Sequence, residues 1–182
     1  KQVPIAALCS LVEATLKASL PPGGHSLQAL TDSERAAELE FDLAVPAQPT
    51  DALSQAWQQL RGGDIRLNKQ RVGGLLRGFI DLVVRIDGRY YVVDYKTNDL
   101  PEYSAKGLEL AMLEHDYDLQ YLLYLLALHR HLGSRLQDYD PRHHLGGALY
   151  LFVRGMAADS ESGVFYRQAP VALIEQLDLQ WR

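Results

Sequence analysis

The sequence predicts an α/β fold with a mixed central sheet flanked by helices. A two-stranded hairpin is indicated at residues 78–96, where two runs of β-branched and aromatic residues flank Asp87-Gly88, a dipeptide suited to a two-residue type I′ turn. A further apolar strand is expected at 145–154, and apolar residues at helical spacing lie on both sides of the hairpin. A chain of 182 residues that is 47% hydrophobic can fill the core of one domain, with or without a small helical lobe.

The segment before the hairpin is expected to contain two longer helices and one strand. Apolar spacing predicts a helix at 4–20, which ends at the Pro-Pro-Gly-Gly stretch that follows. A short helix from Asp32 leads into a strand at 38–45, and Asp51 is expected to cap a helix that runs to about Leu60. After the hairpin in the sequence, helices are predicted at 104–114, at 117–132 and from 170 onward, and a short strand is predicted at 164–166.

The register of the hairpin can be worked out from its turn. Counting back from Asp87-Gly88 places Asp81 opposite Asp94 and Phe79 opposite Lys96, and side chains alternate along each strand. One predicted face carries Arg77, Phe79, Asp81, Val83, Val92, Asp94 and Lys96. The other face, expected to be the core side, carries Ile80, Leu82, Val84, Ile86, Tyr91 and Val93.

The two opposed aspartates indicate a metal site. Carboxylates with Cβ atoms roughly 5 Å apart destabilise a sheet unless a cation or a shared proton lies between them. Mg²⁺ binds one or two carboxylates together with waters and phosphate oxygens. Lys96 shares the face of Asp94 and would bring an ammonium group to the same place. The alternative interpretation is an exposed sheet face with solvated charges.

The helix predicted at 117–132 has two distinct faces. The face expected to pack on the sheet carries Leu119, Leu122, Leu123 and Leu126, at the spacing of an amphipathic helix. A second face carries Tyr117, Gln120, Tyr121 and Tyr124 at the same spacing. The polar groups of this second face could line a groove and bond to phosphate or to a carboxylate of the site. Ordinary amphipathic packing, with the hydroxyls at the surface, is the alternative.

These motifs resemble those of a known family. Asp81, followed by Asp94-Tyr95-Lys96, resembles the split acid and D-x-K elements of the PD-(D/E)XK nucleases. Longer segments are similar to the RecB-like nuclease domains of bacterial RecBCD helicase-nucleases (exonuclease V): 76–83, 88–96, 117–130 and 146–155. The likeness extends from about Glu34 to Arg182. It implies a restriction-endonuclease-like core at 34–182, with 1–33 as a helical lead-in within a single domain.

The resemblance also implies roles for individual residues. Asp81, Asp94 and the carbonyl of Tyr95 are expected to bind Mg²⁺, for which Mn²⁺ could substitute and Ca²⁺ would substitute or inhibit. The residues expected to be catalytic are Asp94, Lys96, Glu38, Gln120 and Tyr124. Gln120 and Tyr124 match a Gln-x-x-x-Tyr motif beside the catalytic centre of RecB-like nucleases. Glu38 and Glu40 are both candidates for the acidic residue of the preceding strand, and two edge-strand charges are the alternative.

One element of the family pattern is absent. RecB-like nuclease domains use a metal-binding His on a helix upstream of the acidic strand, whereas no His precedes His25 in this chain. We therefore expect the chain to begin beyond that histidine and, in isolation, to bind metal weakly and cleave poorly. His143 and His144 do not replace it, because adjacent side chains on a predicted strand point to opposite faces.

Composition narrows the class of protein. The net charge is −5, but residues 61–96 carry eight Lys and Arg against four Asp and Glu, which suits a phosphate backbone unless this is simply a solvated surface. The single Cys9 excludes an intramolecular disulfide and fits a reducing compartment. No apolar run approaches the ~20 residues of a membrane span, and no secretory signal opens the chain, so a cytoplasmic protein is expected.

The resemblance implies a Mg²⁺-dependent deoxyribonuclease that acts in double-strand break repair and recombination. The implied partners are DNA, RecC-like and RecD-like subunits, and a RecA-type recombinase. One alternative is a catalytically impaired module that docks DNA or the recombinase, although Asp81, Asp94 and Lys96 are all present. Another is a hydrolase of small phosphoesters, which would account for the carboxylates but not for the ordered set of RecB-like segments.

Overall fold

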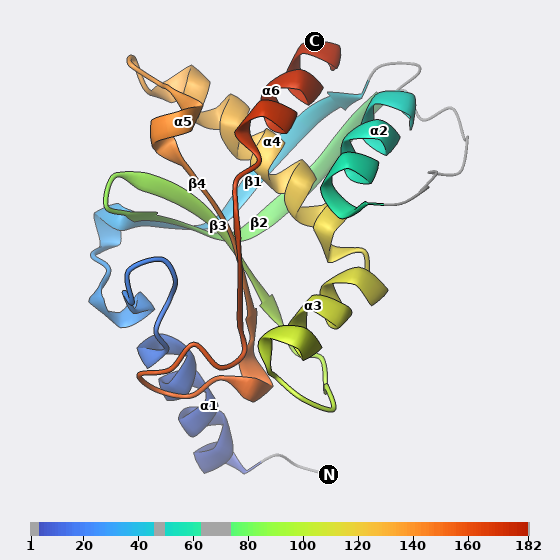
Figure 1. Cartoon of the computed structure of the whole chain (residues 1–182). Coiled ribbons are helices and arrows are strands. Elements are labelled where there is room, and N and C mark those ends of the chain that lie inside the picture. The colour runs from blue at the N-terminus through green and yellow to red at the C-terminus, as the bar shows by residue number, and fades with distance from the viewer. Residues whose placement is uncertain (1–3, 46–49, 63–73, 182) are drawn as a thin grey trace.

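The chain forms a five-stranded mixed sheet with helices packed on it (Figure 1). The computed structural model describes residues 4–45, 50–62 and 74–181. The strands, which lie in sequence order across the sheet, are β1 (Arg35–Val45), β2 (Gly74–Ile86), β3 (Arg89–Lys96), β4 (Leu145–Phe152) and β5 (Val164–Gln168). The helices are α1 (Ile5–Lys17), α2 (Thr50–Arg61), α3 (Ala105–Glu114), α4 (Tyr117–Arg135), α5 (Pro141–His144) and α6 (Val171–Gln180). Short 3-10 turns occupy η1 (Leu27–Ala29), η2 (Asp32–Glu34) and η3 (Val153–Gly155).

The strand directions confirm the predicted mixed sheet. β3 and β4 are parallel, whereas the other neighbouring pairs are antiparallel. A parallel pair needs a crossover connection, and α3 and α4 supply it. All eight residues of β4 are buried, which explains the continuous apolar sequence of this strand between β3 and β5.

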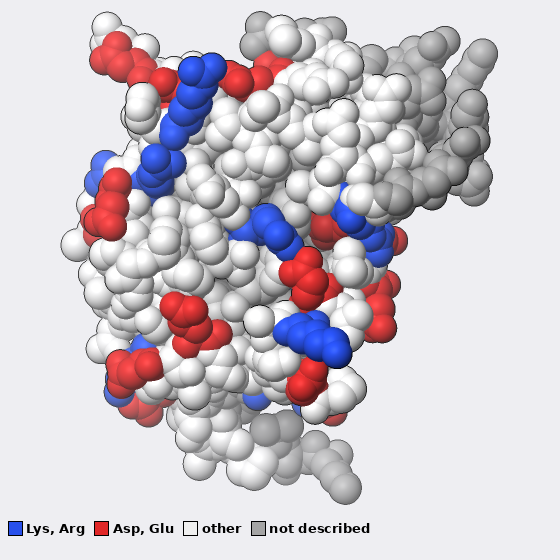
Figure 2. Space-filling view, viewed as in Figure 1, with Lys and Arg blue, Asp and Glu red and all other residues white. Residues whose placement is uncertain are grey.

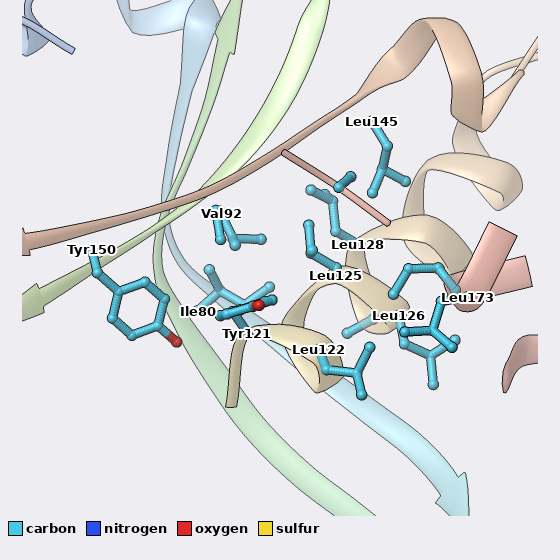
Figure 3. Close-up of a cluster of buried hydrophobic side chains, with 14 of the residues drawn as sticks. Ile80, Val92, Tyr121, Leu122, Leu125, Leu126, Leu128, Leu145, Tyr150 and Leu173 are labelled. Atoms are coloured by element: carbon cyan, nitrogen blue, oxygen red, sulfur yellow. The ribbon is translucent and has the colours of Figure 1, made fainter. Parts of the chain in front are cut away.

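Both faces of the sheet are buried, so the prediction of a single core face is wrong. α2, α3, α4 and α6 cover one face, on which the side chains of α4 lie against Ile80 and Val92 of the sheet (Figure 3). The segment that runs from the end of α1 to η1 covers the other face, where it packs on Leu82, Val84 and Val93. Figure 1 shows α1 on the opposite side of the sheet from α4 and α6.

The predicted hairpin forms, but its ladder is shorter than expected. Ile86 pairs with Arg89 across Asp87 and Gly88, whose positive φ values of 49° and 80° fit a type I′ turn. The ladder ends at the pair Leu82–Val93, so the predicted pairs Asp81–Asp94 and Phe79–Lys96 are not formed; Phe79 pairs instead with Glu40 of β1.

A break in strand alternation explains the early end of this ladder. Ile80 and Val83, three residues apart, both pack in the cluster on the α4 face, whereas the predicted period of two places them on opposite faces. Asp81 lies at this break. The backbone N–H of Tyr95 donates to the carboxylate of Asp81 at 3.1 Å, and not to a carbonyl of β2.

Two predicted elements differ in the structure. The helix expected from Asp32 starts with a capping box of Thr31 and Glu34 but is only one 3-10 turn long, because β1 begins at Arg35. His143 and His144 lie in the short helix α5, which Asp140 caps, and not in a strand. The expected turn at 46–49 lies outside the described residues. No helix among the described residues is long and apolar enough to cross a membrane.

Candidate active site

The predicted site residues of β2, β3 and α4 meet where the β2–β3 ladder ends. Asp94 and Lys96 are two residues apart on β3, so both side chains point to the face that α4 covers. Asp81 reaches the same end of the ladder through its bond with the N–H of Tyr95. Gln120, one turn into α4, bonds directly to Lys96.

Asp94 and Lys96 form a nearly buried ion pair. The Lys96 Nζ lies 2.6 Å from Asp94 Oδ2, and the two side chains are only 12% and 5% exposed. This contact lacks the alignment of a hydrogen bond, so Asp94 Oδ2 is a buried oxygen without a hydrogen-bond partner in the described part of the chain. Burial raises the pKa of Asp94 despite the nearby ammonium group, and the charge of Asp81 adds to this rise.

A network of polar and aromatic groups fixes the position of Lys96. Its Nζ donates to Gln120 Oε1 at 2.9 Å and lies 4.0 Å from the ring centroid of Tyr117, a distance typical of a cation–π contact. The hydroxyl of Tyr150 donates to the same Gln120 oxygen at 3.0 Å. The Gln120 Nε2 donates in turn to the hydroxyl of Tyr124 at 3.0 Å. The ammonium group is therefore held by Asp94, Gln120 and the ring of Tyr117.

The structure corrects one member of the predicted α4 stripe and adds a residue from β4. Tyr121 is 3% exposed and packs in the core, whereas Gln120 and Tyr124 are half-buried beside the site. Tyr150 was not predicted, because it lies in an apolar strand without a polar motif. The signal that could have found it is the parallel pairing of β3 with β4, which places Tyr150 next to Asp94.

Both tyrosines beside Gln120 remain neutral hydroxyls. Burial, followed by the charges of Asp94 and Asp81, raises the pKa of Tyr124 to about 12. Burial also raises the pKa of Tyr150 well above its usual value, and the charge of Asp94 contributes. Each hydroxyl therefore acts as a hydrogen-bond partner and not as a base at neutral pH.

Glu38 lies across from Asp81 in the β1–β2 pair. The flanking pairs are Ala37–Leu82 and Leu39–Ile80, and Glu38 itself has a left-handed φ of 52°. Positive φ is uncommon for residues other than glycine, and the exceptions occur more often at functional sites. Glu40 is instead paired with Arg77, with Nε and Oε1 separated by 3.4 Å. Of the two glutamates, Glu38 is thus the one that lies beside the strand break.

The donor set suits a hard cation that keeps most of its waters. Among the described residues no group of three or more His, Cys, Asp or Glu side chains is arranged to hold a metal ion. The site offers two carboxylates, and Asp94 contributes the buried oxygen that lacks a hydrogen bond. Two carboxylates fit Mg²⁺, which takes few protein ligands, better than they fit an ion that needs a complete protein cage.

The charges on the surface are mixed. On the face shown in Figure 2, acidic and basic side chains lie among one another and do not form one extended basic patch. Three basic residues of the predicted basic segment, Arg66, Lys69 and Arg71, lie outside the described residues.

Comparison with known proteins identifies the family. The model of the PD-(D/E)XK nuclease superfamily matches residues 5–180. RecBCD enzyme subunit RecB of Escherichia coli (strain K12) is 41% identical over 180 residues, which cover 94% of this chain and 15% of that protein. The corresponding subunit of Mycobacterium tuberculosis is 42% identical over 170 residues (87% and 15%), and that of Haemophilus influenzae is 47% identical over 116 residues (62% and 10%).

The matches cover most of this chain but only a small part of the relatives. The chain spans no more than 15% of the length of these three proteins. The family model extends over both the sheet and the helices that carry Asp81, Asp94, Lys96 and Gln120. The predicted α/β core is confirmed, and the chain belongs to the PD-(D/E)XK nuclease superfamily, as a nuclease domain of the RecB type.

Proposed function

We propose that this domain hydrolyses phosphodiester bonds in DNA with the help of a divalent metal ion, Mg²⁺ in the first place. The observation that carries the proposal is the buried Asp94–Lys96 pair, in which a carboxylate oxygen without a hydrogen bond lies 2.6 Å from an ammonium group. Retaining such a pair is costly, since buried charges lose their hydration. A cation and a phosphodiester at this position would offset that cost.

The roles of the side chains follow from their contacts. Asp81, Asp94 and the carbonyl of Tyr95 would hold the ion, whose contribution when bound is to lower the pKa of a water and to neutralise charge on the phosphate. Lys96 donates hydrogen bonds to the attacking water and to the charge that develops on the phosphate. Gln120 keeps the Lys96 ammonium aimed at this position, and Glu38, across from Asp81, orients a further water.

The wider role rests on the relatives. The matched proteins are RecB subunits of the RecBCD enzyme, so this domain would act within such a helicase-nuclease in double-strand break repair and recombination. Its partners would be RecC-like and RecD-like subunits and a RecA-type recombinase, in the cytoplasm. Mn²⁺ would replace Mg²⁺, and Ca²⁺ would occupy the site without supporting cleavage. Residues 34–182 would form the nuclease core and 1–33 its lead-in.

A cleavage assay tests the proposal. Linear single-stranded and duplex DNA are incubated with the full-length protein and Mg²⁺, and the products are resolved on denaturing gels. We expect Asp94→Asn and Lys96→Met to lower the rate at least about 100-fold, since each removes a group that acts on the developing charge. Asp99→Asn is the matched control, because Asp99 is an exposed aspartate beyond the end of β3.

Two results would contradict this assignment. Undiminished cleavage by both site variants would exclude the Asp94–Lys96 mechanism. DNA binding without any cleavage by the wild-type protein, with Mg²⁺ or Mn²⁺, would favour the alternative of a nuclease fold that serves only as a docking module.

A further inference from the structure

Two aromatic side chains next to the site are exposed on the face of the sheet opposite α4. Phe79 is 54% exposed and precedes Asp81 by two residues on β2. Tyr95 is 38% exposed and lies between Asp94 and Lys96 on β3. Within the described part of the chain neither ring stacks on another aromatic ring or on a cation. Part of each ring is thus exposed and not engaged by another aromatic ring or a cation of the described residues.

The packing of neighbouring residues shows that both rings lie on the same side of the sheet. Ile80 packs in the cluster under α4, so the adjacent Phe79 points the other way. Lys96 bonds to Gln120 of α4, so the adjacent Tyr95 likewise points away from that helix. The polar groups of α4 therefore line one side of the site, and two aromatic rings flank its other side.

The surroundings of Tyr95 tie its side chain to the site. The N–H of Tyr95 holds the carboxylate of Asp81. The ring of Tyr95 is therefore attached at the backbone position that holds Asp81, between Asp94 and Lys96.

We propose that Phe79 and Tyr95 stack on unpaired nucleobases beside the scissile phosphate and so hold single-stranded DNA at the site. The proposal rests on the function proposed above and adds two binding residues to it. Every base has a π-face, so stacking on protein rings tolerates any sequence. In a duplex the base faces are already stacked on one another, which leaves the rings a partner only at unpaired or frayed nucleotides.

Binding measurements without a divalent ion separate this role from cleavage. Fluorescence anisotropy is recorded with a labelled single-stranded oligonucleotide and with a blunt duplex of the same sequence, both in EDTA. We expect Phe79→Leu and Tyr95→Leu each to weaken single-strand binding about tenfold, because stacking is worth on the order of a factor of ten per base. Phe79→Trp and Tyr95→Phe, which keep a ring, should bind as the wild type does, and duplex binding should change less than twofold in all four.

Abasic nucleotides provide the matching change in the DNA. An oligonucleotide with abasic positions should bind the wild-type protein as weakly as the intact strand binds Phe79→Leu. The abasic oligonucleotide should bind Phe79→Leu with little further loss of affinity, since both changes remove the same contact. Unfolding midpoints are measured for all four variants to exclude misfolding as the cause of weaker binding. The midpoints of the two Phe79 variants should stay close to that of the wild type, because Phe79 is exposed.

Several outcomes would overturn the inference. The first is that both leucine variants bind single-stranded DNA with wild-type affinity, and the second is that they lose the same affinity for the blunt duplex. The third is that the losses from the leucine substitution and from the abasic positions add up. The fourth is that the wild type shows no measurable single-strand binding. These results are distinct from failure of the nuclease assignment. Ring-dependent binding without cleavage would remove the nuclease function alone, and cleavage that is indifferent to both rings would remove only the stacking role.

Discussion

At the scale of single residues, the site is built from groups that burial disfavours. The carboxylate of Asp94 is almost inaccessible, and one of its oxygens has an ion-pair contact but no hydrogen bond. Glu38, which lies across from Asp81 on β1, adopts a left-handed backbone conformation. Proteins commonly retain such unfavourable arrangements where activity requires them. Residues of the site can therefore lower the free energy of unfolding.

Asp94→Asn should therefore stabilise the fold while it abolishes cleavage. Because burial raises the pKa of Asp94 in the folded state, the ionised form costs stability, and this cost appears as the pH rises through the usual carboxyl range. The variant should match the wild type at pH values below about 3.8, where both side chains are neutral, and exceed it in unfolding midpoint at pH 7.

Thermal unfolding followed by circular dichroism at several pH values checks this expectation. Asp99→Asn changes an exposed aspartate beyond the end of β3; this variant serves as the control and should show no gain. A lower midpoint for Asp94→Asn at pH 7 would mean that the ion pair with Lys96 stabilises the fold more than burial costs.

At the scale of elements, the site depends on the parallel pairing of β3 with β4 and on the placement of α4. The register places Tyr150 next to Asp94, and α4 brings Gln120 between the Tyr150 hydroxyl and the Lys96 ammonium. The helix also fills the core beneath the sheet, so one element carries both stability and the polar groups of the site (Figure 3). A small change in β4 should therefore reach Lys96 through Gln120.

Tyr150→Phe should lower the turnover number without a comparable change in KM. The variant loses one hydrogen bond to Gln120, worth about 0.5–1.5 kcal/mol, so the ammonium group is held less firmly in the transition state and kcat should fall by about tenfold or less. Steady-state kinetics on linear DNA measure the effect.

Tyr139→Phe is the matched control for this variant. Its hydroxyl bonds to His129 at 3.0 Å near the other end of α4. The control should lose similar stability but keep its kcat. An equal loss of kcat in both variants would show that the effect of Tyr150 comes from stability alone.

At the scale of the whole molecule, the fold places the carboxylates of Asp81 and Asp94 at one site of a chain whose net charge is −5. The charges visible in Figure 2 are mixed, so general attraction between a basic surface and DNA contributes little on that face. Recognition of the substrate should therefore depend on contacts at the site itself, which include the proposed cation and the exposed rings of Phe79 and Tyr95.

Divalent ions should stabilise the folded protein through these carboxylates. An ion present at ten times its dissociation constant raises the free energy of unfolding by about 1.4 kcal/mol when it binds only the folded state. Denaturant unfolding with and without Mg²⁺ measures this increase. The double variant Asp81→Asn with Asp94→Asn should lose it, and an equal gain in that variant would place the ion elsewhere.

The sequence by itself determined the turn, most strands and helices, and most of the residues that we propose for the site. Asp87-Gly88 fixes the hairpin because a type I′ turn needs a positive φ at both central residues, which few dipeptides accept. Apolar periodicity identifies α4 as a helix. The tertiary structure alone decided where the β2–β3 ladder ends, that both faces of the sheet are buried, and that Tyr150 holds Gln120. These features depend on which strands and helices become neighbours, and such long-range packing can override the local period of two that the sequence displays.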